Sequence, residues 1–280
     1  MEIFLVSFFF LALAKPLIFK LCSLRLDHRT APVFISFFTL TGLLVTLPWF
    51  APLMQAGTKT LVENPFLLGL CLFKGVVFWH ACYNGQRLMQ KSLSSTHFIL
   101  PPAIAVASLI NAFLGEALTM QEWVSVAGLC SLGFVFYFRG HLQEVPGETR
   151  KIYLLLVALT VIMLICDHYI IKQSNWFVYL FYSNAALLVF CLLKRKGRAV
   201  WRSALMTWPA IAAGVTFAVF EIVKFYPMVT YIPVAVMTSV QFSVIPLVLI
   251  SSALLWKERT WQEQLVWGGF SLFFFALLLV

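Results

Sequence analysis

The stretch LGEALTMQEWVSVAG (Leu114–Gly128) is nearly repeated half a chain later as WKERTWQEQLVWGG (Trp256–Gly269). In each copy a Glu ends a long apolar run, a Thr-x-Gln-Glu box follows, and a Gly lies in the next apolar run. The equivalent pairs are Glu116 and Glu258, Thr119 and Thr260, Gln121 and Gln262, Glu122 and Glu263, and Gly128 and Gly269. Internal repeats of this kind in an apolar chain predict a transporter built from two related halves.

The composition predicts a helical membrane protein. Hydrophobic residues make up 61% of the 280 residues and charged residues only 11%, with a mean hydropathy of +0.92. A soluble domain is closer to half apolar and a quarter charged. The net charge of +9 is interpreted as loop Lys and Arg that orient the chain, not as a nucleic-acid surface. No P-loop, Cys-x-x-Cys pair or nucleophile elbow occurs, so we expect no cofactor, no metal and no enzyme.

A span needs about twenty apolar residues, and the chain has room for ten such helices. We expect them at residues 3–22, 31–51, 66–88, 93–115, 121–139, 151–171, 175–193, 204–226, 231–256 and 261–280. The predicted fold is therefore all-α, with five spans in residues 1–140, a linker at 141–150 and five spans in residues 151–280. An odd number of spans in each half inverts the second half relative to the first, with a central cavity between them.

The loop charges predict the orientation. Fifteen of the 20 Lys and Arg residues fall on one side of a ten-span chain, while only Lys59 and Lys172 fall on the other. Cytoplasmic loops carry the basic excess, so both termini are predicted to face outward. The predicted location is a bacterial inner membrane.

The chain resembles the ten-span EamA-type branch of the drug/metabolite transporter superfamily. The likeness is carried by Pro102, Glu116-Ala-Leu-Thr119 and Gly128 in the first half, and by Pro246, Glu258-Arg-Thr260 and Gly269 in the second. It implies a basket in which the first four helices of each half line the cavity and the fifth lies outside. It also implies carrier-type movement of small organic metabolites. The chain departs from many members after its second span, where only Lys59 is basic.

Charged and polar residues inside predicted spans normally face the bundle interior. Lys15 and Asp167 occupy equivalent places in the two halves. They form a functional pair across the cavity, form a static pair, or extend to opposite membrane surfaces. Glu221 and Lys224 are three residues apart on one helix and can pair with each other. The other candidates of this kind are His97, Asn111, His168 and Gln241.

The third span is the most amphipathic. Its polar and aromatic residues form one stripe, which we expect to line the cavity, although helix packing would explain an aromatic stripe equally simply. The residues of the stripe are Lys74, Trp79, His80, Tyr83, Asn84 and Arg87.

Four prolines in the spans are predicted hinges, because a proline leaves a backbone carbonyl without its helical partner. They are Pro16, Pro101, Pro102 and Pro246. The Thr-x-Gln-Glu boxes are interpreted instead as structural caps of the next helix, with Thr119 and Glu122 in the first half and Thr260 and Glu263 in the second.

The sequence therefore predicts a secondary carrier for a small polar or zwitterionic organic metabolite, with alternating access. Its expected partners are this small molecule, the bilayer and a candidate coupling proton, which Glu221 or Asp167 would bind. The alternative is a flippase for a lipid-linked substrate, whose phosphate would meet a basic rim at Arg25, Arg29, Arg87 and Lys91.

Overall fold

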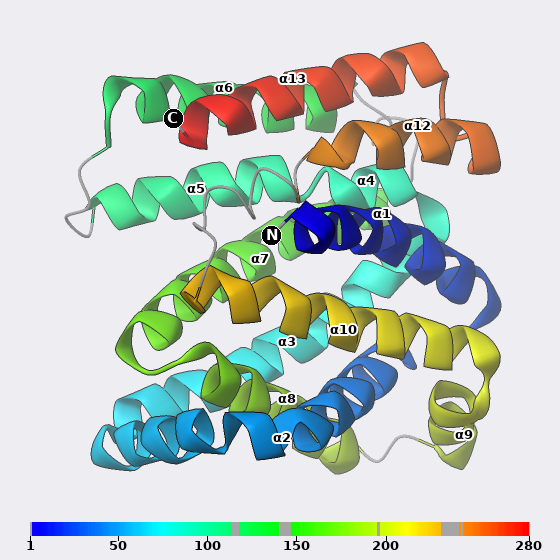
Figure 1. The fold of residues 1–280 in the computed structure, drawn as a ribbon. Coiled ribbons are helices and arrows are strands. Elements are labelled where there is room, and N and C mark those ends of the chain that lie inside the picture. Colours follow the sequence, from blue (N-terminus) through cyan, green and yellow to red (C-terminus); the bar gives the residue numbers. More distant parts are fainter. Residues whose placement is uncertain are drawn as a thin grey trace.

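The protein is described here by a computed structural model covering residues 2–113, 118–139, 147–194, 197–230, 241 and 243–279. Of the described residues, 91% are helical and none is in a strand. The helices are α1 (Glu2–Arg25), α2 (Ala31–Glu63), α3 (Pro65–Lys91), α4 (Leu93–His97), α5 (Leu100–Phe113), α6 (Met120–Arg139), α7 (Gly147–Gln173), α8 (Trp176–Leu193), α9 (Arg198–Met206), α10 (Trp208–Thr230), α12 (Ile245–Trp256) and α13 (Trp261–Leu279) (Figure 1).

Seven helical stretches in the described residues are long and apolar enough to cross a membrane. They lie in α1, α2, α3, α4 together with α5, α7, α8 and α10, and α12 is a shorter apolar helix. This agrees with the multi-pass helical membrane protein that the composition predicts.

The second helix is much longer than expected. The span predicted at 31–51 continues to Glu63 in α2, and Pro48 and Pro52 both lie inside this helix. Gly57 lies in the same helix, where a Cβ would collide with Asn175 and Val178 at the start of α8. It therefore serves close packing of α2 against α8 rather than a turn.

Two other elements differ from the expected spans. The predicted helix 93–115 is broken into α4 and α5, and α9 is a separate short helix before α10. Pro101 and Pro102 lie in the first turn of α5, where a missing backbone N–H costs no helical hydrogen bond. The break is thus built into the sequence at the point where the proline pair begins.

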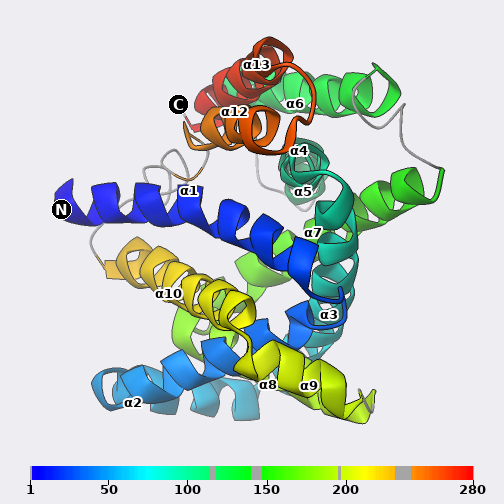
Figure 2. The ribbon, with the colours of Figure 1, turned by 90° about the vertical axis from the view of Figure 1, so that its right-hand side faces the viewer.

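The long helices pack in reciprocal pairs. Helix α1 packs against α10 as α7 packs against α3, and α2 packs against α10 as α8 packs against α3. In the same way, α5 contacts α6 and α7, while α12 contacts α13 and α1. Figure 2 shows α1 and α10 side by side, and α2 on the far side of α10.

Helices α6 and α13 lie together at one edge of the molecule, outside α5 and α12 (Figures 1 and 2). Glycines allow α6 to approach α5 closely, and α13 to approach α12. A Cβ at Gly133 of α6 would meet the Pro102 ring, and a Cβ at Gly268 of α13 would meet Pro246. Pro102 and Pro246, two of the predicted hinges, therefore pack tightly against the next long helix.

Some sequence predictions fall outside the described residues. They concern Glu116, residues 141–146 of the linker predicted at 141–150, and the beginning of the span predicted at 231–256.

Candidate functional site

An ion pair joins α1 to α10 in the interior of the bundle. Lys15 Nζ lies 3.6 Å from Glu221 Oε1, and the two side chains are 26% and 15% exposed. The same ammonium lies 3.7 Å from the centre of the Phe220 ring, in a cation–π contact. Pro16 follows directly, and because it has no N–H, the carbonyl of Ala12 has no helical partner at that position.

A second ion pair joins α3 to α7. Lys74 Nζ lies 2.9 Å from Asp167 Oδ1, and the Tyr179 hydroxyl of α8 donates a hydrogen bond to the same oxygen. The Lys74 ammonium lies 3.9 Å from the centre of the Tyr179 ring. The sequence analysis did not identify Tyr179, because a tyrosine in an aromatic-rich helix gives no separate signal.

The expected pairing of Lys15 with Asp167 is therefore wrong. The two residues are on α1 and α7, and these helices pack principally against α10 and α3, respectively. Glu221 likewise pairs with Lys15 rather than with Lys224 on its own helix. Lys224 instead lies 4.9 Å from the centre of the Phe225 ring.

A chamber of about 230 Å³ lies beside the Lys15–Glu221 pair. Its polar lining consists of Lys15, Thr96, His97 and Gln241, and Ala12 and Pro16 also face it. Three residues predicted to bind substrate and one predicted hinge are thus brought together here from α1, α4 and residue 241. We call this space the polar chamber.

A second chamber of about 220 Å³, which we call the apolar chamber, adjoins it. Four lining residues belong to both: Phe19, Met89, Thr96 and Leu100. No residue of α6 or α13 is among the lining of either chamber.

The stripe on α3 does not line these chambers. The Trp79 ring stacks on Tyr83 with 5.2 Å between their centres, and the Tyr83 hydroxyl is 3.0 Å from His28 Nε2. Trp79 also contacts Phe190 at the end of α8. The expected cavity wall is therefore a packing surface, and α3 faces the apolar chamber with the neighbouring face that carries Phe78, Cys82 and Gln86.

Three predicted site residues that lie away from the chambers are His80 and Asn84 of the stripe, and His168 of α7. His80 is exposed beside this packing surface, and the Asn84 amide donates to the His80 carbonyl within the helix. His168 is exposed on α7, next to Asp167. Among the described contacts, these residues have no part in either ion pair.

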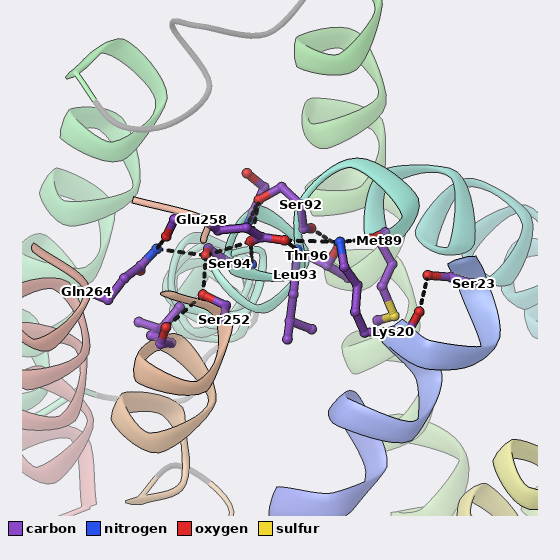
Figure 3. A network of polar contacts seen from close by, with 12 residues as sticks. Lys20, Ser23, Met89, Ser92, Leu93, Ser94, Thr96, Ser252, Glu258 and Gln264 are labelled. Atoms are coloured by element: carbon purple, nitrogen blue, oxygen red, sulfur yellow. Dashed lines mark hydrogen bonds and ion pairs between the residues drawn. The ribbon is translucent and has the colours of Figure 1, made fainter. Parts of the chain in front are cut away.

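A polar site rich in hydrogen bonds lies at the junction of α1, α4, α12 and α13 (Figure 3). Glu258, only 6% exposed, accepts hydrogen bonds from the backbone N–H groups of Leu93 (2.8 Å) and Ser94 (3.0 Å). Lys20 Nζ binds the same carboxylate at 3.0 Å, and donates to the Met89 carbonyl at 2.7 Å. We call this arrangement the Glu258 network.

Hydroxyl and amide groups complete the Glu258 network. The hydroxyls of Ser92 and Ser94 donate to Glu258 at 3.2 and 2.9 Å, and Gln264 Nε2 donates to Ser94 Oγ at 2.8 Å. Burial alone would raise the pKa of Glu258, but the N–H groups of Ser94 and Leu93 and the Lys20 ammonium lower that pKa below its usual value. The carboxylate is therefore held in its charged form.

The turn before α13 carries local strain that this network holds in place. Lys257 and Arg259, on either side of Glu258, have positive φ angles of 56° and 64°. Such angles are unfavourable for residues with a side chain and persist where surrounding contacts impose them. Glu258 was interpreted as a residue at a helix end, and its burial was missed; the serine-rich segment after α3 was the available signal.

The capping interpretation is confirmed in the first half. Thr119 N–H donates to Glu122 Oε2 at 2.6 Å, and Glu122 N–H donates to Thr119 Oγ1 at 3.3 Å, which forms a complete capping box. In the second half Glu263 N–H donates to Thr260 Oγ1, while the Glu263 carboxylate contacts Arg259 instead.

Comparison with known proteins adds no relative to this picture, because no protein-family model and no curated protein matches the chain.

Proposed function

We propose that this protein is a secondary carrier that moves a small organic metabolite across a membrane by alternating access. The proposed architecture is ten spans in two inverted five-helix halves, as in the EamA-type branch of the drug/metabolite transporters that the sequence resembles. The proposed setting is a bacterial inner membrane, with both termini outside.

The reciprocal helix contacts support two inverted halves. The main contacts of α1 and α2 with the later helices have counterparts made by α7 and α8: α1–α10 corresponds to α7–α3, α2–α10 to α8–α3, and α1–α12 to α7–α5. The ion pairs obey the same exchange with their charges reversed. The first helix of one half carries Lys15 and pairs with Glu221, and the first helix of the other half carries Asp167 and pairs with Lys74.

The observation that carries the proposal is the Lys15–Glu221 pair beside the polar chamber. Charges at membrane depth are costly unless they are paired or serve a wet cavity. This pair is long, partly exposed and bordered by His97 and Gln241. The Lys15 ammonium lines the chamber, and the Glu221 carboxylate lies 3.6 Å from it, so a small polar or zwitterionic molecule would meet both charges when the pair separates. The pair also joins the two halves that would move relative to each other.

Glu221 and Asp167 are the two carboxylates proposed to bind a coupling proton. Asp167 is held by both Lys74 and Tyr179, whereas the described contacts of Glu221 include one cation at 3.6 Å. The Lys15–Glu221 pair therefore has fewer contacts to break, and we propose that Lys15 binds substrate when this pair separates.

None of the basic residues suggested for a lipid phosphate, Arg25, Arg29, Arg87 and Lys91, lines either chamber. A carrier for a soluble molecule is therefore the function that we propose.

The experiment is exchange in proteoliposomes. Purified protein is first screened for metabolites that raise its unfolding temperature, since a ligand of the folded state stabilises it. Vesicles preloaded with the unlabelled ligand should then accumulate labelled ligand, and an imposed proton gradient should change the rate. Ligand binding without exchange, or flux that preloading does not stimulate, would contradict a carrier.

A further inference from the structure

The apolar chamber is built for a bulky apolar group. Its lining comes from α1, α2, α3, α4, α5, α7 and α10 together with Ile99, so it lies at the centre of the helices that pack around the ion pairs. Its polar lining residues are Gln86, Thr96 and Thr160, and the remaining lining residues are apolar, among them Phe19, Phe78 and Phe217.

One polar group in this wall lacks a partner. Gln86 is 6% exposed, and its Oε1 accepts a hydrogen bond from the Ala31 N–H at 3.0 Å. Its Nε2 makes no hydrogen bond to any described residue. A buried donor without an acceptor is unfavourable, so a ligand acceptor placed beside Gln86 would stabilise the complex.

The chamber is also large enough for an aromatic ring. An apolar cavity of about 150 Å³ accommodates benzene, and this chamber measures about 220 Å³. A molecule confined to it would leave the Lys15–Glu221 pair untouched. Because Phe19, Met89, Thr96 and Leu100 line both chambers, one molecule can extend from one to the other.

We infer that the ligand of this site is amphipathic. Its charged head lies in the polar chamber at Lys15 and Glu221, and a bulky aromatic or branched-aliphatic group fills the apolar chamber. A hydrogen-bond acceptor on that group receives the free N–H of Gln86. This inference rests on the proposed carrier function, since it identifies the bound ligand with the transported substrate. It narrows the substrate class to molecules that have both a charged head and a bulky apolar group.

The first test uses three pairs of probes that differ only by a phenyl group: alanine and phenylalanine, ethylamine and 2-phenylethylamine, propionate and 3-phenylpropionate. Thermal unfolding in detergent gives the affinity of each probe. For at least one head group, the phenyl member should bind about tenfold or more tightly than its partner, because it buries apolar area. Equal affinities in all three pairs, or no binding by any phenyl probe, would overturn the inference.

A matched pair of variants locates the binding. Gly85 lines the apolar chamber and Gly69 is exposed on the same helix, and a Cβ at either position meets no atom within 4 Å. Gly85→Leu should fill the chamber and abolish the advantage of the phenyl probe. Gly69→Leu should leave it unchanged. Loss of the advantage in both variants, or in neither, would place the phenyl group elsewhere.

Gln86→Glu tests the hydrogen bond. It keeps the oxygen that accepts from Ala31 and replaces the free N–H donor by an acceptor. A 4-acetyl group on the tightest phenyl probe should strengthen binding to the unmodified protein by about two- to tenfold. That gain should disappear in the variant; a gain of the same size in both proteins would contradict the role of Gln86.

Exchange of the tightest probe in proteoliposomes separates the two proposals. Binding in the apolar chamber without exchange would sink the carrier while leaving the amphipathic site intact. Exchange of alanine, ethylamine or propionate that persists in Gly85→Leu, with no advantage for phenyl probes, would support the carrier and refute this inference.

Discussion

Two Lys–Glu pairs of this protein differ in how many hydrogen bonds and ion contacts their carboxylates make. Glu258 accepts from five donors and is 6% exposed, with its Lys20 partner at 3.0 Å. Glu221 has its Lys15 partner at 3.6 Å, next to a chamber. The same two residue types thus form a fixed junction in one place and an exchangeable pair in the other. The number of hydrogen-bond donors around the carboxylate, and not the charges of the pair, decides whether the pair is fixed or exchangeable.

The largest effect is expected at the fixed junction. Glu258→Gln leaves the Lys20 ammonium buried without its counter-charge, so the free energy of unfolding should fall by about 3–5 kcal/mol. Thermal unfolding of the detergent-purified protein measures this loss.

Glu263→Gln is the control for Glu258→Gln. Glu263 is half-exposed, and its described ion pair is with Arg259, four residues earlier in the chain. The free energy of unfolding should change by about 0.5 kcal/mol or less. Equal losses in the two variants would remove the distinction between a buried network and a surface pair.

Acid should weaken the Glu258 network. The pKa of Glu258 is lowered in the folded protein, while that of a free Glu side chain is about 4.3. Its contribution to stability is therefore complete above the unfolded-state pKa and is lost as the pH falls through the folded-state pKa. Unfolding temperatures measured from pH 7 to pH 3 should fall more steeply for the natural protein than for Glu258→Gln; parallel curves would contradict the assignment.

The contact between α12 and α13 can be tested at two adjacent glycines. Gly268→Ala places a Cβ 2.6 Å from the Pro246 Cα, and this overpacking should cost about 1–3 kcal/mol. In Gly269→Ala the new Cβ meets no atom within 4 Å, and the free energy of unfolding should rise by up to about 1 kcal/mol because alanine has the higher helix propensity. Thermal unfolding of the two variants should move in opposite directions, and a shared direction would refute the close packing at Pro246.

The smallest expected effect is at the helix caps. Thr119→Ala removes the hydroxyl of a complete capping box and should cost about 1 kcal/mol of stability. Thr260→Ala removes only a single cap contact and should cost less. A greater loss at Thr260 in thermal unfolding would contradict the difference between the boxes.

The sequence predicts local features better than the partners of buried charges. The Thr119 box and the break between Glu63 and Pro65 follow from neighbours in the chain, and both are present. The partner of Lys15 depends on which helices touch, and spacing along the chain carries no such information. Glu258 shows the same limit, because its donors Leu93 and Ser94 lie more than 160 residues away.

The prediction that the α3 stripe lines the cavity was wrong for a different reason. In a chain with 61% hydrophobic residues, an aromatic stripe fits packing as well as it fits a cavity. The Trp79–Tyr83 stack points to α8, whereas the chamber lies against Phe78 and Gln86, one position before Trp79 and three after Tyr83. Which face of the helix meets the chamber is decided by its neighbours α1, α7 and α10.

The most direct measurement of the central claim is ligand exchange by Glu221→Gln in proteoliposomes, expressed per folded molecule. The account predicts a protein that unfolds close to the natural temperature but exchanges ligand at least about tenfold more slowly, a change of 1.4 kcal/mol or more. Normal exchange by folded Glu221→Gln would contradict the claim that the Lys15–Glu221 pair is the exchangeable site of a carrier.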